Sequence, residues 1–191
     1  MTSTLGHTLL GLLAARPSTG YDLARRLRRP VGYFWSAGHS QIYPELARLE
    51  GDGLLRHTVV AGAGPRDTKR YRVTAAGRRA LRAWLLATTP DVDEREILLR
   101  VYLLFALSPA EAVAVVEAVR EHHRRTLAEF LTHRTDDDAA TQEWGPDVTS
   151  RTTLEWGITF EEGRIRWCEG ILVDLRRRLA EPLVSPPSPP R

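Results

Sequence analysis

The stretch from Gly38 to Gly53 limits the fold of this chain most narrowly, because it fits one helix whose two faces differ in character. Ile42, Leu46 and Leu49 recur at i, i+4 and i+7, which places them on one apolar stripe that faces a core. The opposite face carries no carboxylate, as a helix in the major groove of DNA requires, although a solvated surface helix would also fit. The residues predicted on this outer face and its flank are Ser40, Gln41, Tyr43, Pro44, Ala47 and Arg48.

The residues before this helix predict two further helices. Residues 5–15 form an apolar segment, which we expect to be a buried first helix. Thr19 and Asp22, three residues apart, match a capping box at the start of a second helix. The aromatic segment 31–37 would then connect to the central helix and fill the small core. Three successive helices of this kind predict a helix-turn-helix domain.

After the central helix the sequence changes from a helical spacing to that of β-strands. Residues 54–60 and 68–73 are β-prone and flank a glycine-rich turn, so they predict a hairpin. Residues 74–86 follow as a further helix with a threonine cap. Residues 1–88 are therefore predicted to be a winged helix-turn-helix domain, with the recognition helix in the major groove and the wing at the backbone or the adjacent minor groove. The cations of the predicted wing are Arg66, Lys69 and Arg70.

The charge of the chain is unevenly distributed. Residues 1–88 hold 14 of the 27 Lys and Arg residues but only 5 of the 24 Asp and Glu residues, so the first part is basic and the rest is acidic. A basic module joined to an acidic one is typical of a polyanion-binding domain on a separate scaffold. Chance clustering of solvated arginines is the alternative interpretation.

The second half is predicted to be helical. Helices are expected over residues 94–107, 109–133 and 151–180, and Ser108 and Pro109 give the second of them a strong start signal. Residues 89–181 are therefore expected to form a helical dimerisation domain. The Pro-rich and Ser-rich tail, residues 182–191, is expected to be disordered.

The last of these helices carries a heptad seam, in which apolar residues step alternately by four and three positions. Only one carboxylate interrupts the seam, which consists of Leu154, Ile158, Glu161, Ile165, Cys168, Leu172, Leu175 and Leu179. Trp156, Phe160 and Trp167 add a second stripe. A helix this apolar is expected to pack against a second copy of the chain. Such a homodimer would bind a pseudo-palindromic operator with half-sites about one helical turn apart, roughly 34–36 Å.

Several of these segments together resemble the PadR family of bacterial transcriptional regulators. The run Ile-Tyr-Pro-Glu-Leu-Ala-Arg-Leu-Glu, followed at this distance by Tyr-Arg-Val-Thr, is more specific than a bare helix-turn-helix pattern. The resemblance implies a mainly α fold with a small β-hairpin wing, and repression that a small molecule relieves. The matching segments are residues 10–13, 19–23, 41–54 and 70–77, with 154–158 and Trp167 in the second half.

Individual residues receive roles from their chemistry and position. Gln41 and Ser40 could read base edges, although Ser40 could instead cap the helix. Tyr43 and Arg48 could contact phosphates, and the resemblance implies the same for Tyr21. The alternative for Tyr43 is packing against the second helix. The cations of the wing are expected to contact the DNA backbone. Trp156, Phe160, Glu161 and Trp167 could line a pocket for a small aromatic or cationic effector, although core packing is the simpler interpretation.

Other functions are not supported by the sequence. We expect no enzyme, because no nucleophile elbow, phosphate-binding loop or dinucleotide fingerprint occurs. Cys168 is the only cysteine and the histidines lack ligand spacing, so no metal or cofactor is expected. With no long apolar run and no signal-peptide pattern, we expect a cytoplasmic protein without a membrane partner. A constitutive or architectural DNA-binding protein without effector remains the alternative to a ligand-responsive repressor.

Overall fold

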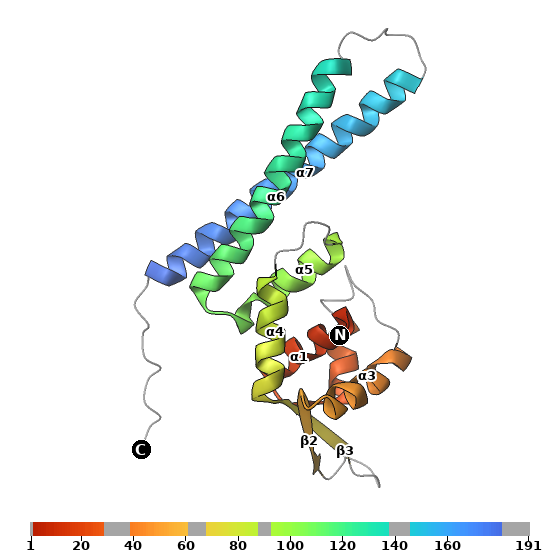
Figure 1. Cartoon of the computed structure of the whole chain (residues 1–191), viewed down its shortest axis with the longest axis vertical. Helices are drawn as coiled ribbons and strands as arrows, with labels where there is room; N and C mark the ends of the chain where they lie inside the picture. Colours follow the sequence, from red (N-terminus) through yellow and green to blue (C-terminus); the bar gives the residue numbers. More distant parts are fainter. Residues whose placement is uncertain (1, 29–38, 61–67, 88–92, 138–145, 181–191) are drawn as a thin grey trace. The chain divides into compact units, whose positions relative to one another are not determined.

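The computed structural model describes residues 2–28, 39–60, 68–87, 93–137 and 146–180, and the chain divides into two compact units at Ser108. The fold is mainly α with one small sheet, as predicted (Figure 1). None of the described helices is long and apolar enough to cross a membrane. The first unit holds α1 (Thr4–Ala15), β1 (Ser18–Thr19), α2 (Gly20–Arg28), α3 (His39–Gly51), β2 (Leu55–Val60), β3 (Thr68–Val73), α4 (Ala75–Leu86), α5 (Glu94–Tyr102) and the 3-10 helix η2 (Leu104–Ala106), and the second holds α6 (Pro109–Asp137) and α7 (Pro146–Ala180).

Side-chain caps start the helices of the first unit. The Asp22 N–H donates to Thr19 Oγ1 over 3.1 Å and the Thr19 N–H to Asp22 Oδ2 over 3.4 Å, which confirms the predicted capping box. Thr74 caps α4 by accepting a hydrogen bond from the Gly77 N–H over 3.1 Å. These caps satisfy N–H groups that have no partner within a helix.

The end of α3 requires a glycine. Gly53 has φ 70°, a conformation that favours glycine because it has no Cβ. The Leu54 N–H donates to the Leu49 carbonyl and the Gly53 N–H to the Glu50 carbonyl, each over 2.9 Å. This pair of bonds is a Schellman motif, which ends the helix and directs the chain into β2.

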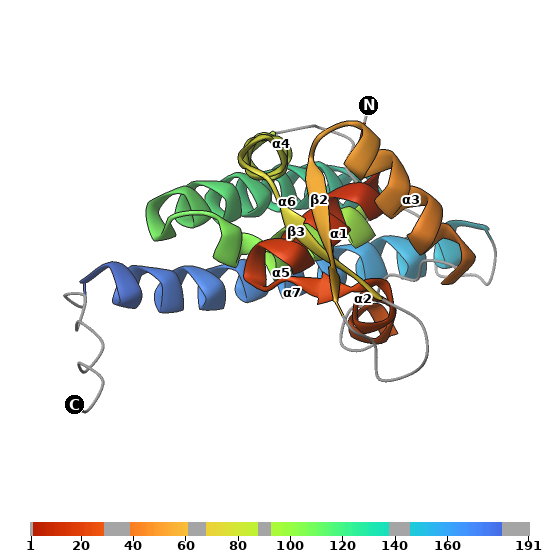
Figure 2. The same ribbon diagram turned by 90° about the horizontal axis from the view of Figure 1, so that it is seen from below.

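The wing is part of a three-stranded antiparallel sheet in the order β1-β3-β2. The short strand β1, which the sequence did not predict, pairs with β3, with Ser18 opposite Tyr71. In the hairpin His57 is paired with Tyr71 and Arg56 with Arg72. Figure 2 shows the hairpin beside α3. One face of the sheet is buried at Leu55, Tyr71 and Val73, and the other is exposed at Arg56, Thr58, Arg70 and Arg72.

The core of the first unit is built almost entirely of leucine side chains. It includes Leu99 of α5 and Leu103, both fully buried. The compact unit therefore extends beyond the domain boundary expected at residue 88, because Leu99 of α5 and Leu103 pack into this core. The other fully buried members of this core include Leu9, Leu10, Leu12, Leu23, Ile42, Leu46 and Leu49.

The second unit is a pair of antiparallel helices. Near the end of α6, Phe130 lies against Gly157 in the first half of α7. At the other end of the pair, Glu117 near the start of α6 contacts Arg176 near the end of α7. The seam of α7 faces α6 of the same chain, with Ile158, Cys168 and Leu172 buried. Within the chain, α6 covers this part of the seam, and the packing of α7 against a second copy stays a prediction. The heptad spacing predicts that one face of α7 is buried, but it does not identify the helix that covers this face.

Some boundaries and predictions differ from the described structure or lie outside it. α7 begins at Pro146 rather than near residue 151, since proline suits the first turn of a helix, and α6 continues past residue 133 to Asp137. The predicted helix over 94–107 changes to a 3-10 turn after Tyr102. The aromatic connector 31–37, the wing tip with Arg66 and the tail 182–191 lie outside the described residues.

Candidate nucleic-acid interface

The two faces of α3 are divided as the sequence predicts. Ile42, Leu46 and Leu49 are buried, and they anchor the helix in the core of the first unit. Ser40, Gln41, Pro44 and Ala47 are exposed on the opposite side. Pro44 lacks an N–H, so it cannot bond the carbonyl of Ser40 one turn earlier. The outer face thus presents a serine hydroxyl, an amide and small apolar groups.

Two tyrosines lie where α2 begins beside α3. Tyr43 is 49% exposed, and a Cβ added at Gly20 would lie only 2.6 Å from its Cε1 atom. The ring of Tyr43 therefore rests on the bare backbone of Gly20 while much of it remains exposed. Tyr21, the next residue of α2, is 62% exposed. Both tyrosines thus lie at the junction between α2 and α3.

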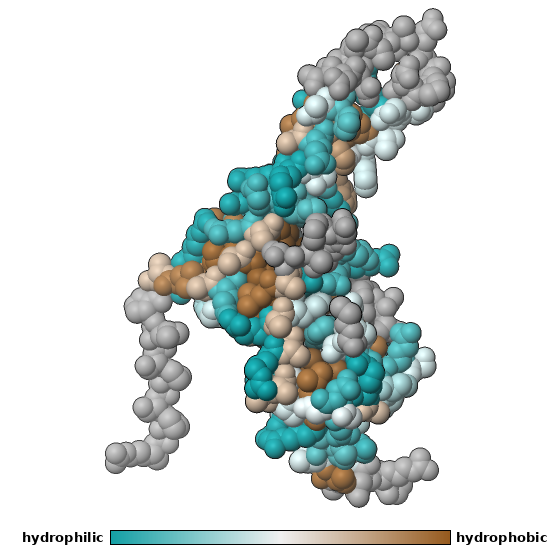
Figure 3. All heavy atoms as spheres, viewed as in Figure 1, coloured by the Kyte–Doolittle hydropathy of each residue, from teal (hydrophilic) through white to brown (hydrophobic). Residues whose placement is uncertain are grey.

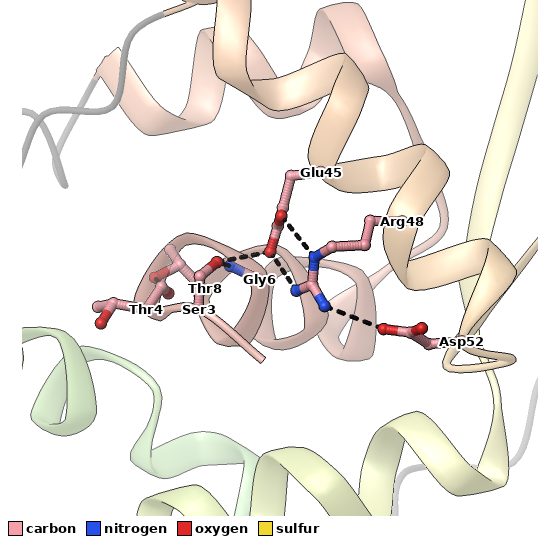
Figure 4. Close-up of polar contacts among 7 residues, drawn as sticks. All are labelled: Ser3, Thr4, Gly6, Thr8, Glu45, Arg48 and Asp52. Carbon is pink, nitrogen blue, oxygen red and sulfur yellow. Dashed lines mark hydrogen bonds and ion pairs between the residues drawn. The ribbon is translucent and has the colours of Figure 1, made fainter. Parts of the chain in front are cut away.

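Arg48 is held by one carboxylate of its own helix and one of the turn that follows it (Figure 4). Its Nη2 and Nε donate to the two oxygens of Glu45 over 2.6 and 2.9 Å, and Nη1 donates to Asp52 over 2.9 Å. The side chain of Glu45 is largely buried, and Ser3 Oγ at the start of α1 donates to it over 2.5 Å. Arg48 is therefore not the open cation that the helical wheel suggests.

The hydrogen bonds from Arg48 and Ser3 keep Glu45 ionised. Arg48, the larger influence, lowers the pKa of the Glu45 carboxyl below its ordinary value, burial opposes the shift, and Ser3 adds to it. The same ion pair raises the pKa of Arg48. A bidentate arginine and carboxylate pair has a fixed geometry, so this cluster ties α3 to the first turn of α1.

The wing presents its cations on both faces of β3. Lys69 and Arg70 are exposed, and as neighbours on a strand they point to opposite sides. Arg56 and Arg72 are directly opposite each other on β2 and β3 and are also exposed. Like charges in such a pair destabilise a sheet, so the arrangement favours an anionic partner. The sequence analysis missed these two arginines, although the alternation between positions 70 and 72 of a predicted strand was a usable signal.

The wing is also connected to α3. His57 of β2 places its Nδ1 2.5 Å from Oε1 of Glu50, near the end of α3. Its ring lies 5.9 Å from the ring of Tyr71, centroid to centroid. The orientation of the hairpin relative to α3 is therefore fixed by a polar contact as well as by the sheet.

The residues proposed for an effector pocket do not share one face of α7. Trp156 and Phe160 are stacked with their centroids 4.7 Å apart, and they are 64% and 40% exposed. Trp167 is 38% exposed. Glu161 points instead to α6, where it is buried and its Oε2 lies 2.7 Å from Nδ1 of His123.

Arg164 connects these two groups. Its guanidinium lies 4.3 Å from the centroid of the Phe160 ring and donates to Glu161. Arg164 is thus the arginine that pairs with the seam carboxylate Glu161, whereas Arg166 pairs with Glu162. The second partner, His123, was missed because its position depends on the register of α6 on α7.

The described residues do not suggest metal or thiol chemistry. No group of three or more His, Cys, Asp or Glu side chains that could hold a metal is found among the described residues. Cys168 is buried in the seam, and burial raises the pKa of its thiol to about 11, so the thiol is protonated at neutral pH.

The described geometry is that of a winged helix-turn-helix regulator, and comparison with known proteins gives the same class. Residues 9–83 match the model of the transcriptional regulator PadR-like family, and residues 95–176 match the model of the virulence activator alpha C-terminal domain. The chain belongs to the PadR-like family of transcriptional regulators. The second match begins within α5, before the point at which the contacts divide the two compact units.

Two curated relatives match over almost their full length. The "Probable transcriptional regulator Rv1176c" of Mycobacterium tuberculosis is 30% identical over 91% of this chain and 98% of its own. The "Negative transcriptional regulator PadR" of Bacillus subtilis is 28% identical over 88% of this chain and 95% of its own. Among solved structures, B. subtilis PadR in complex with operator DNA is 27% identical and covers 91% of this chain and 99% of its own, with a TM-score of 0.45.

Proposed function

We propose that this chain represses transcription by binding an operator, with the exposed face of α3 in the major groove. The observation that carries this proposal is the exposed pair Arg56 and Arg72, directly opposite each other on a sheet that is anchored to α3 through His57 and Glu50. The name of the B. subtilis relative, a negative transcriptional regulator, supports repression as the direction of control.

Each exposed residue of the interface has a role in this proposal. Gln41 and Ser40 read base edges, with the amide of Gln41 matched to adenine. Tyr43 and Tyr21 contact phosphates from the junction of α2 and α3. The cations of the hairpin contact the backbone: Arg56, Lys69, Arg70 and Arg72, together with Arg66. Arg48 holds α3 in place through Glu45 and does not itself read the DNA.

We further propose that the chain acts as a homodimer. Trp156, Phe160 and Trp167 stay exposed after α6 has covered the seam of α7. Figure 3 shows hydrophobic residues at the surface over parts of α6 and α7. Exposed aromatic side chains that gather on one helix mark a protein interface more often than a solvated surface. Two chains joined in this way would present two recognition helices to a pseudo-palindromic operator.

An aromatic carboxylate is the class of effector that we propose. Glu161 is already paired with His123 and Arg164, so a cationic ligand would find no open carboxylate there. The guanidinium of Arg164, which also pairs with Glu161, lies over the ring of Phe160, and that ring stacks on Trp156, so a positive charge borders the exposed rings. Binding at this stripe would alter the proposed dimer surface and thereby the spacing of the two recognition helices.

Two further questions are whether the protein responds to an effector and whether it has a catalytic activity. A constitutive or architectural DNA-binding protein would share the interface and would not respond to ligands. We propose no catalytic activity, in keeping with a family of transcriptional regulators. As a regulator of transcription in a bacterium, the protein is proposed to act in the cytoplasm.

The test is a fluorescence anisotropy titration with duplexes that the protein has selected from a random-sequence pool. A homodimer that binds an operator predicts selection of a pseudo-palindrome, and benzoate or cinnamate is expected to weaken its binding. Binding that no aromatic acid changes would favour the constitutive regulator. Failure to select any sequence would contradict the proposal.

A further inference from the structure

The first turn of α1 contacts both the recognition helix α3 and helix α5. On one side Ser3 Oγ donates to Glu45 of α3, and Gly6 leaves so little space that a Cβ there would overlap the Glu45 carboxylate (Figure 4). On the other side Thr4 Oγ1 donates to Oε2 of Glu96 in α5 over 3.2 Å. Two adjacent side chains of one turn thus bind carboxylates from two different helices.

Ring contacts reinforce the side of this turn that faces α5. His7, one turn after Ser3, is stacked on Trp84 of α4 with the centroids 4.7 Å apart and the planes 3° from parallel. Arg100 of α5 lies 5.0 Å from the centroid of the same Trp84 ring. Arg100 in turn binds Glu96, with Nη2 2.8 Å from Oε1.

These contacts form a continuous connection from Glu45 to Glu96. Arg100 and Glu45 are both largely buried, and each is held by more than one hydrogen bond. Side chains held in this way have few alternative rotamers, so a displacement of α5 displaces the turn as well. Glu45 and Glu96 both accept hydrogen bonds from the start of α1, so α1 provides a direct route by which a change at one helix can reach the other.

We propose that the first turn of α1 couples the position of α3 to that of α5, which makes Thr4 and Glu96 positioning residues for operator binding. This inference rests on the proposed function. α5 is the last α-helix before the second unit begins at Pro109, so the turn would carry a change at α5 to the recognition helix.

The experiment compares two identical substitutions one turn apart in the full chain. Thr4→Val removes the hydrogen bond to Glu96, whereas Thr8→Val removes only a bond to the Thr4 carbonyl within α1. Glu96→Gln removes the charge from the α5 side. Amide hydrogen exchange of the DNA-free protein is measured over α3, and thermal unfolding shows that each variant is folded.

We expect exchange in α3 to become about two- to fivefold faster in Thr4→Val and Glu96→Gln and to stay unchanged in Thr8→Val. The ratio of operator affinity to random-duplex affinity should fall three- to tenfold, roughly, in the first two variants, because phosphate contacts survive while base contacts lose their alignment. Unchanged exchange in α3, or equal effects of both threonine substitutions, would overturn the coupling. If the wild-type protein prefers no duplex, the proposed function fails, while the exchange measurement still decides the coupling.

Discussion

The two units of this chain differ in where they place their polar and apolar side chains. In the first unit the core is mostly leucine, His7 and Arg100 are buried beside it, and the Glu45 and Arg48 pair lies at its edge. In the second unit a carboxylate and an imidazole, Glu161 and His123, are buried between the helices, while Trp156 remains outside. The first unit is therefore complete as a folded domain, whereas the second leaves apolar surface for a partner.

The difference follows from size as much as from sequence. A helix pair has one contact face, so each helix that is apolar on two sides can bury only one of them. Burying a carboxylate and an imidazole costs desolvation free energy, so such a contact favours the register that pairs them more than it adds stability. We therefore interpret the contact between Glu161 and His123 as fixing the register of α6 on α7. We interpret the aromatic stripe as the surface through which two chains form the proposed dimer.

The largest effect is expected from truncating the aromatic stripe. Trp156→Ala combined with Phe160→Ala should raise the dimer dissociation constant by about 100-fold or more, because buried aromatic anchors contribute about 2 kcal/mol or more each. Sedimentation velocity over a range of concentrations measures this constant. Phe105→Ala, which removes a similarly exposed ring from η2, is the matched control and should leave the constant unchanged. An equal dissociation constant for the two variants would contradict the claim that the second unit carries the dimer surface.

A second prediction compares cavities in the two cores. Leu46→Ala should lower the free energy of unfolding of the first unit by about 3–4 kcal/mol, because Leu46 is fully buried. Leu172→Ala should also destabilise the second unit, and the urea midpoint of that unit should rise with protein concentration in wild type and variant alike, because association is proposed to stabilise it. Urea denaturation at two concentrations about a hundredfold apart tests this. A midpoint of the second unit that is independent of concentration would show that the second unit folds alone.

A third prediction concerns pH and the first unit. Burial lowers the pKa of His7 from 6.5 to about 4. Between these values the unfolded chain binds a proton that the folded unit does not, so stability is lost as the pH falls through this window, by about 3 kcal/mol in total. His7→Phe keeps a ring against Trp84 and should remove this dependence, which urea denaturation across the window would show. An unchanged pH dependence in the variant would assign it to other groups.

For the second unit the same measurement should give a weaker pH dependence. Burial also lowers the pKa of His123, but Glu161 opposes that shift. The sign is the same as for His7, so the second unit should also lose stability on acidification.

The smallest effect is expected at the wing. Lys69→Ala and Arg70→Ala should each weaken operator binding a few-fold and reduce the slope of log K against log salt by about 0.9. Arg177→Ala, an exposed arginine of α7, is the control and should change neither quantity. Slopes that stay at the wild-type value in both wing variants would show that the hairpin does not contact phosphates.

The elements of the first unit could be predicted from the sequence because their signals are local. The spacing of Ile42, Leu46 and Leu49 and the glycine at position 53 gave the position of α3 to within about two residues. The i−3 and i+4 positions of Glu45 and Asp52 could also have revealed the partners of Arg48. Ser3 could not have been found in this way, because its contact with Glu45 depends on how α1 crosses α3.

The second unit was harder to predict for the same physical reason. A heptad pattern is the same whether the covering helix belongs to the same chain or to another, so the seam on α7 did not reveal α6 as its partner. The pairing of His123 with Glu161 joins residues 38 positions apart and depends on the helix register. Local spacing contains no information about that register.

The most direct test of the central claim is the number of chains bound to one selected operator duplex, measured by sedimentation equilibrium. Two wild-type chains per duplex, and loss of this two-chain complex with Trp156→Ala and Phe160→Ala, are the predicted results. One chain per duplex at full affinity, or two chains that assemble without the aromatic stripe, would contradict it.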